Sequence, residues 1–169
     1  MLGSTYQVSV RRARATDSTA LVEIFRESWR SAYRGIIPHL HLETMIRRRG
    51  PEWWRNAARG GEGLLVLEVA GTVAGYATHG AARGKSTQKG EIYELYLAPS
   101  YQGIGLGEHL FEACRHRLDQ RRLPGLIVWA LIDNSAATAF YWRRGGRPVT
   151  SVFDRIGGAK LEKVAFAWD

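Results

Sequence analysis

Three glycines within five residues mark the stretch PSYQGIGLGEHL, between a segment that alternates as a β-strand does and a segment with helical spacing. Gly103, Gly105 and Gly107 therefore stand where a strand ends and a helix begins. Several main-chain N–H groups at such a terminus have no partner within the helix, and the helix dipole favours negative charge there. Because glycine has no side chain and tolerates positive φ, an anion can approach this backbone closely. The stretch predicts a phosphate site.

Two other nucleotide-binding patterns fit the sequence less well. A dinucleotide fingerprint has the form G-x-G-x-x-G after a first strand, whereas the glycines here are spaced G-x-G-x-G after the fourth expected strand. The stretch HGAARGKST ends as a P-loop does, but its first glycine is Gly80, and His79 stands where a P-loop has glycine. No strongly apolar helix follows, so this stretch predicts a solvated hairpin turn.

The order of the expected elements indicates a mixed sheet with helices on both faces, an α/β (α+β) fold. Alternating or continuous apolar stretches predict strands, and apolar residues three and four apart predict helices. The expected strands cover residues 6–13, 63–71, 73–83, 90–99, 126–132, 148–158 and 160–169, and the expected helices cover residues 18–33, 35–50, 51–61, 105–120 and 134–146.

Length and composition limit the class of protein. The chain has 169 residues, 45% of them hydrophobic, which suits one globular domain over residues 1–169. Its single cysteine, Cys114, excludes an intrachain disulfide, suits a reducing compartment and lies on an apolar helix face, where we expect it in the core. The longest apolar run, Leu126 to Ile132, is too short to span a bilayer, and no signal peptide is visible. We expect a cytoplasmic protein without a membrane partner.

The formal net charge of +8 favours anionic partners such as nucleic acids and polyphosphate cofactors. A basic nucleic-acid-binding domain is one alternative, but aromatic residues do not interleave the basic clusters, so we expect no nucleic-acid partner. Arg47 to Arg49 predict a solvated helix terminus. His39 and His41 lack a third ligand at a recognisable spacing, so we expect no metal site.

The stretch LYLAPSYQGIGLGEHLFEAC resembles motif A of the GNAT superfamily, the acetyl-CoA-dependent N-acetyltransferases. In that motif a strand and a proline precede the pattern [RQ]-x-x-G-x-[GA], which opens a helix. Gln102, Gly105 and Gly107 stand at those positions, and Gly103 stands at the usual companion position.

A second helix extends the resemblance. NSAATAFYWRRGG resembles the family's next helix at Asn134, Phe140 and Tyr141. The family often has Gly-Phe after this helix, whereas here Gly145 is followed by Gly146, which puts the packing beneath the helix in question. The resemblance implies the GNAT fold, a mixed, mostly antiparallel sheet of six to seven strands with helices on both faces.

The resemblance also implies acetyl-CoA as the cofactor. Main-chain donors of the fourth strand would run beside the pantetheine arm, the glycine loop would hold the pyrophosphate, and the later helix would approach the sulfur. The cofactor-binding residues implied in this way are Leu95, Leu97, Gln102, Gly103, Ile104, Gly105, Leu106, Gly107, Asn134 and Tyr141.

Acetyl transfer to an amine requires a proton acceptor, because an alkylammonium has a pKa near ~10.4, and a proton donor for the departing thiolate. By resemblance Tyr141 would be the donor, and an aromatic that fills the core is the alternative reading. Glu91 and Glu94 are the candidate acceptors, with Glu91 preferred. Strand alternation puts them on opposite faces unless a bulge intervenes, and either could instead pair with an arginine at the surface.

The acceptor pocket should, by resemblance, come from the early helices. Trp29 and Tyr33 lie one helical turn apart there, a spacing that core packing would also explain. The sequence thus predicts an N-acetyltransferase that moves an acetyl group from acetyl-CoA to a primary amine by direct transfer in a ternary complex. A non-catalytic acyl-CoA-binding sensor of the same fold is the alternative. The acceptor stays open among a small amine, an amino acid, an antibiotic and a protein N-terminus, and we expect a homodimer because similar proteins frequently dimerise.

Overall fold

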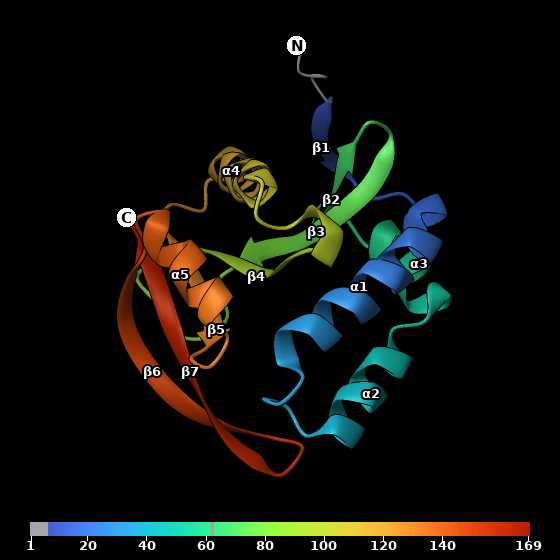
Figure 1. Cartoon of the computed structure of the whole chain (residues 1–169). Coiled ribbons are helices and arrows are strands. Elements are labelled where there is room, and N and C mark those ends of the chain that lie inside the picture. Colours follow the sequence, from blue (N-terminus) through green and yellow to red (C-terminus); the bar gives the residue numbers. More distant parts are fainter. Residues whose placement is uncertain (1–6, 62) are drawn as a thin grey trace, which may run out of the picture.

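The computed structural model describes residues 7–61 and 63–169, and its strands form one sheet in the order β1-β2-β3-β4-β5-β7-β6 (Figure 1). Neighbouring strands are antiparallel except β4 and β5, which are parallel. The expected mixed, mostly antiparallel sheet is confirmed, and the expected start of its first strand at Tyr6 lies outside the described residues. The strands are β1 (Val8–Arg12), β2 (Leu64–Val69), β3 (Thr72–Ala81), β4 (Gly90–Leu97), β5 (Leu126–Leu131), β6 (Arg147–Ile156) and β7 (Ala159–Trp168).

Helices cover both faces of the sheet, as the sequence predicts. Three of them lie on one face and two on the other (Figure 1). No helix in the described part of the chain is both long and apolar enough to cross a lipid bilayer. The first face carries α1 (Ser18–Tyr33), α2 (His39–Arg48) and α3 (Pro51–Arg59), and the second face carries α4 (Leu106–Gln120) and α5 (Ser135–Arg143).

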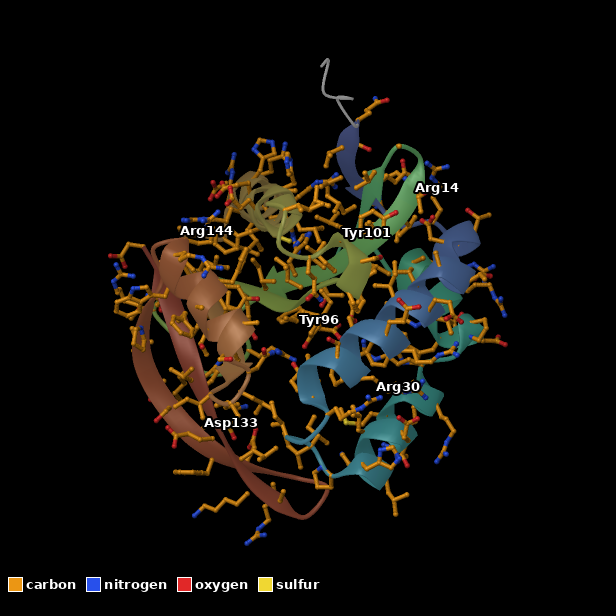
Figure 2. The ribbon with its side chains drawn as sticks, in the orientation of Figure 1. Arg14, Arg30, Tyr96, Tyr101, Asp133 and Arg144 are labelled. Atoms are coloured by element: carbon orange, nitrogen blue, oxygen red, sulfur yellow. The ribbon has the colours of Figure 1, made fainter. Side chains whose placement is uncertain are left out.

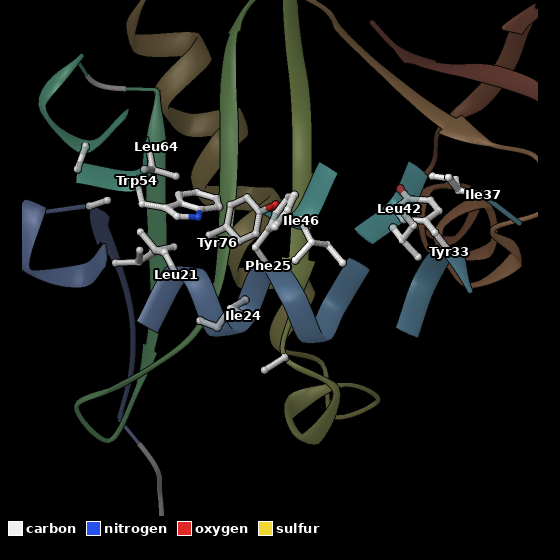
Figure 3. Packing of buried hydrophobic residues seen from close by; sticks show 14 of the residues in the cluster. Leu21, Ile24, Phe25, Tyr33, Ile37, Leu42, Ile46, Trp54, Leu64 and Tyr76 are labelled. Carbon is white, nitrogen blue, oxygen red and sulfur yellow. The ribbon is translucent and has the colours of Figure 1, made fainter. Parts of the chain in front are cut away.

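Each face of the sheet has its own hydrophobic core. The core beneath α1, α2 and α3 contains Phe25, Trp54 and Tyr76, all of them fully buried (Figure 3). The core beneath α4 and α5 contains Phe111 and the buried Cys114, which is the core residue that the sequence predicts. Burying one large apolar side chain stabilises a fold by about 1.5–3 kcal/mol, so each core holds its helices firmly against the sheet.

The sheet opens between its two central strands. β4 pairs with β5 only at Gly90 and Glu91, and the ladder ends there. The register of β4 against β3 also shifts, because Tyr93 is an extra residue in β4. A bulge of this kind bends a strand and interrupts its alternation. The second half of β4 therefore runs along an open edge, at the point where α4 and α5 approach it.

Trp168 explains the departure from the family pattern after α5. A Cβ atom at Gly146 would lie 2.5 Å from Cζ2 of the Trp168 indole. That indole donates from Nε1 to the Arg144 carbonyl oxygen at 3.0 Å and packs against Phe111, with the ring centroids 5.2 Å apart. The indole of β7 thus fills the space beneath α5, and only glycine fits at residue 146.

Two further expectations concern charged stretches. Residues 79–87, which end as a P-loop does, lie at the end of β3 and in its connection to β4, in agreement with the expected turn. Arg47 and Arg48 are exposed at the end of α2, also as expected. The same expectation is wrong for Arg49, whose side chain is only 23% exposed because aromatic rings of α1 and α3 surround it.

Candidate active site

A cleft of about 680 Å³ lies at the open edge of β4, between the end of α1 and the beginnings of α4 and α5. Its volume falls within the range of about 300–1,000 Å³ that is usual for ligand sites. The cleft brings most of the predicted site residues together. Those that line it are Tyr33, Glu94, Leu95, Leu97, Gln102, Gly103, Gly105, Leu106, Gly107, Asn134 and Tyr141.

The glycine loop gives the cleft its anion-binding end. Gly103 and Gly105 have φ of +78° and +82°, and a Cβ atom on either residue would meet nothing within 4 Å. Their glycine identity is therefore required by left-handed backbone and not by crowding within the protein. Gly105 is the N-cap of α4 and supplies no side-chain cap, so the first-turn N–H groups of the helix face the cleft. These groups and the helix dipole suit a phosphate.

Gly107 lines the cleft and also contacts α5, whereas Ile104 does not line the cleft. A Cβ atom at Gly107 would lie 3.1 Å from Cε2 of Phe140, so this glycine allows α4 and α5 to approach each other closely. The Ile104 side chain is 68% exposed and does not line the cleft. At the same end, Arg144, directly after α5, forms an ion pair with Glu108 of α4.

The edge of β4 supplies main-chain groups along the cleft. The Ala98 N–H donates to the Ala74 carbonyl oxygen of β3 at 2.9 Å. Because hydrogen-bonding direction alternates along a strand, Leu95 and Leu97 direct their main-chain groups away from β3 and into the cleft that they line. Gln102 Nε2 donates to the Leu97 carbonyl oxygen at 3.0 Å, which ties the glycine loop to this strand. A ligand with amide groups could pair with such an edge as an added strand does.

Two residues of the α5 segment also face the cleft. The Asn134 side-chain oxygen accepts from the Ala137 N–H at 3.3 Å and caps α5. Tyr141 is 6% exposed, and burial raises its pKa well above the ordinary value for a phenol. The Tyr141 hydroxyl is therefore protonated at neutral pH, as a proton donor must be.

The two candidate carboxylates have different environments. Glu91 is 1% exposed, does not line the cleft, and accepts from the Arg83 N–H at 2.9 Å and from Arg83 Nη2 at 2.8 Å. Glu94 lines the cleft. The extra residue Tyr93 puts both carboxylates on the same side of β4 by register, so strict alternation does not separate them. Of the two, the structure brings only Glu94 to the cleft.

Glu94 is held by three side chains that sequence reasoning did not connect to it. Its Oε1 accepts from Arg49 Nη1 at 2.6 Å and from the Tyr76 hydroxyl at 3.2 Å, and its Oε2 accepts from Thr78 Oγ1 at 3.0 Å. Arg49 is itself held by cation–π contacts, 4.6 Å from the Phe25 ring centroid. The carboxylate therefore has a fixed orientation, with Oε2 the less occupied of its two oxygens.

Aromatic side chains form the wall beside Glu94. The Trp29 and Tyr33 ring centroids lie 4.9 Å apart, and the Trp29 and Tyr96 ring centroids lie 5.5 Å apart. Tyr96 lies near the centre of Figure 2. The hydroxyls of Tyr33 and Tyr96 are hydrogen-bonded to each other. Burial raises the pKa of Tyr33, and raises those of Tyr76 and Tyr96 still further. The phenols of this wall therefore stay protonated at neutral pH.

A second cavity of about 260 Å³ adjoins the cleft. Trp29 lines this second cavity, while Tyr33, Glu94 and Tyr96 line both. Of the two predicted acceptor residues, Tyr33 thus lies where the cavities meet and Trp29 lines the second cavity alone. Within the described residues, no three His, Cys, Asp or Glu side chains are grouped as a metal ion would require.

Comparison with known proteins identifies the architecture. The model of the Acetyltransferase (GNAT) family matches residues 19–145. The uncharacterized N-acetyltransferase YuaI of Bacillus subtilis (strain 168) is 28% identical over 95% of this chain and 92% of its own length. A spermidine N(1)-acetyltransferase of Thermoplasma acidophilum is 25% identical over 82% of this chain and 87% of its own.

A solved structure shares the fold and contains the cofactor. The PaiA N-acetyltransferase of Thermoplasma acidophilum, crystallised in complex with coenzyme A, superposes with a TM-score of 0.75 over 94% of this chain and 98% of its own, at 21% identity. The open edge of β4 and the glycine loop before α4 are surroundings that suit the amide groups and diphosphate of that cofactor. The chain belongs to the acetyltransferase (GNAT) family and is an acetyl-CoA-dependent N-acetyltransferase.

Proposed function

We propose that this protein acetylates a primary amine by direct transfer from acetyl-CoA within a ternary complex. One observation carries the proposal: the cleft that suits the cofactor and the second cavity share Glu94, Tyr33 and Tyr96. A cofactor in one cavity and an amine in the other would meet beside a carboxylate. Direct transfer needs the two substrates side by side, because the amine attacks the thioester without a covalent enzyme intermediate.

Main-chain groups would hold the cofactor. The N–H groups at the start of α4, with Gly103 and Gly105 before them, would bind its diphosphate. The edge of β4 at Leu95 and Leu97 would pair with its amide groups. When bound, acetyl-CoA supplies the acetyl group as an activated thioester.

Glu94 would accept the proton of the acceptor amine. An alkylammonium has a pKa near ~10.4 and is almost fully protonated at neutral pH, so it must lose a proton before it can attack. Oε2 of Glu94 is the oxygen that would take this proton, directly or through one water. Arg49, Tyr76 and Thr78 hold the carboxylate in place, which keeps it from turning away from the amine.

Tyr141 would donate a proton from its hydroxyl to the departing sulfur. A free phenol at ~10 and a free thiol at ~8.5 have pKa values close enough for this transfer. Burial raises the pKa of Tyr141, which keeps the donor protonated between turnovers. Asn134 would act indirectly, by capping the helix that carries Tyr141.

Location and assembly complete the proposal. A cytoplasmic location is supported by the supply of acetyl-CoA that the reaction needs and by the single, buried Cys114. We also propose one domain over residues 1–169 and a homodimer, since the exposed edge strand β6 could pair with a second copy. Sedimentation velocity tests the dimer.

A thiol-release assay with a panel of amines tests the function. We expect acetyl-CoA to bind with one molecule per chain by isothermal titration, and at least one amine to release coenzyme A catalytically. Stoichiometric binding without turnover of any amine would instead support the sensor. The absence of binding would contradict the proposal altogether.

A further inference from the structure

We infer that the acceptor is a small amine that also carries a carboxylate, as an α-amino acid does. This inference rests on the proposed function and concerns the second cavity. Its volume of about 260 Å³ lies below the range of about 300–1,000 Å³ for larger ligands, so it suits a small molecule or the end of a peptide.

The charges that line the second cavity are unevenly distributed. Of the described residues that line it, Arg49, Arg83 and Lys163 carry positive charge and Glu94 alone carries negative charge. The carboxylates that pair with Arg83 and Lys163 are Glu91 and Asp154, and neither lines the cavity. A ligand in the cavity would therefore meet these cationic groups, whereas the carboxylates that pair with Arg83 and Lys163 lie outside the lining.

Arg83 and Lys163 have donors to spare for an anion. Arg83 directs Nη2 to Glu91, yet a guanidinium has five N–H donors and this side chain is 67% exposed. Lys163 Nζ lies 2.8 Å from an Asp154 carboxylate oxygen, and an ammonium has three donors. The anion would thus bind at the end of the cavity that these two residues form.

The cationic groups are also fixed in position. The Arg83 guanidinium lies 4.3 Å from the Tyr93 ring centroid, and Lys163 Nζ lies 5.0 Å from the Trp129 centroid. Both rings line the same cavity. Charges that are held in place against aromatic faces lose little side-chain freedom on binding a ligand, which favours selective recognition.

Arg49 binds Glu94 and is therefore not available to an anionic ligand in the way that Arg83 and Lys163 are. Its guanidinium donates to Glu94 and is surrounded by the rings of α1 and α3. The charged residues of the lining therefore form two groups, which we call its poles. The Glu94 pole would take the ammonium group, and the Arg83 and Lys163 pole would take the carboxylate. A polyamine would instead bring additional positive charge to the cationic pole, so this chain should differ from its spermidine-acetylating relative.

Acceptor pairs that differ only in the carboxylate test the inference. The twenty α-amino acids, their amides and spermidine are assayed with the full-length protein at saturating acetyl-CoA. We expect the preferred amino acid to exceed its own amide by about tenfold or more in kcat/KM, since a lost charge-assisted hydrogen bond has this effect. Peptide amides that begin with Asp or Glu lack an α-carboxylate, and their kcat/KM values show whether a side-chain carboxylate can bind in its place.

Variants of Lys163 and Arg83 test whether these two residues bind the carboxylate of the acceptor. Lys163→Gln should raise the KM for the amino acid by about tenfold, and Lys163→Glu should reverse the preference in favour of the amide. Arg83→Lys retains a charge beside the buried Glu91 while removing the guanidinium fork, and should also raise this KM. Lys160→Gln on the same strand and Lys85→Gln in the same connection are the controls, because neither residue lines a cavity.

The outcomes separate the inference from the proposed function. A raised amino-acid KM with an unchanged acetyl-CoA KM supports the inference. Amides or spermidine that react as well as the amino acids would overturn the inference and leave the acetyltransferase proposal standing. Equal effects of the Lys163 and Lys160 variants would also overturn it. Turnover of no acceptor at all would contradict the proposed function on which the inference rests.

Discussion

The two ends of the active-site cleft are built from different kinds of groups. At the α4 end, main-chain N–H groups and left-handed glycines from one continuous stretch, residues 95–107, line the cleft. At the Glu94 end, side chains from α1, the α2–α3 junction, the β3–β4 connection, β4, β5 and β7 line the second cavity. Main-chain groups can hold a common cofactor whatever the surrounding sequence, whereas side chains can change from one relative to another and alter the acceptor. We therefore expect substitutions at the Glu94 end to change acceptor recognition without changing cofactor binding.

Gly105→Val should disrupt the α4 end of the cleft and spare the Glu94 end. A branched side chain would enter the open space before the helix, so we expect coenzyme A to bind at least about 100-fold more weakly, or about 2.7 kcal/mol. Gly71→Val in the β2–β3 turn has the same φ of +82° and also an open Cβ position, so it reproduces the backbone strain away from the cleft. Titration calorimetry with a thermal unfolding control measures both. Equal loss of binding in both variants would refute the placement.

Glu94→Gln should impair acetyl transfer at the Glu94 end. We expect kcat to fall by about 10²–10³-fold, because the amine loses its proton acceptor, with no change in coenzyme A affinity. The defect should shrink as the pH approaches the pKa of the acceptor amine, where the amine loses its proton unaided. Glu91→Gln is the matched comparison, and it should lower stability while leaving kcat within about threefold, since Glu91 lies against Arg83 outside both cavities. A larger kcat defect in Glu91→Gln than in Glu94→Gln would reverse the assignment.

Tyr141→Phe tests the proposed proton donor, which lines the cleft and not the second cavity. The variant keeps the ring that packs beneath α5 and removes only the hydroxyl. We expect kcat to fall by about 10²-fold with little change in coenzyme A affinity. Stopped-time assays of coenzyme A release measure kcat, and calorimetry measures affinity. An unchanged kcat would mean that Tyr141 only packs in the core.

Alkaline pH should lower the free energy of unfolding through the buried tyrosines of the Glu94 end. Burial raises the pKa values of Tyr76 and Tyr96, so the folded protein retains phenolic protons that the unfolded chain loses above about pH 10. The stabilisation is therefore complete below pH 10, and the free energy of unfolding should fall by about 1.4 kcal/mol per pH unit for each such phenol above it. Urea unfolding at pH 9 to 11 measures this slope. A slope that Tyr96→Phe leaves unchanged would show that this residue does not contribute.

The α4 end could be predicted from the sequence because its parts are neighbours. The strand, the proline, the glycines and the helix lie within one short segment, and local backbone geometry alone determines what faces the ligand there. Gly107 was the exception, since its contact with Phe140 depends on how α5 packs against α4.

The Glu94 end could not be predicted in the same way because its contacts are distant in the chain. Arg49 and Glu94 are 45 residues apart, and a run of three arginines at a helix end is typical of a solvated terminus. The preference for Glu91 over Glu94 depended on the face of β4, and Tyr93 interrupts that alternation as an extra residue. The bulge arises from pairing with β3, so alternation within one strand does not reveal it.

A crystal structure of the protein with coenzyme A would show whether the glycine loop binds the cofactor. We expect diphosphate oxygens within hydrogen-bonding distance of the main-chain N–H groups at residues 103–108, with the thiol directed toward Glu94 and Tyr141. A cofactor bound elsewhere on the chain, or one whose sulfur points away from the second cavity, would contradict this expectation.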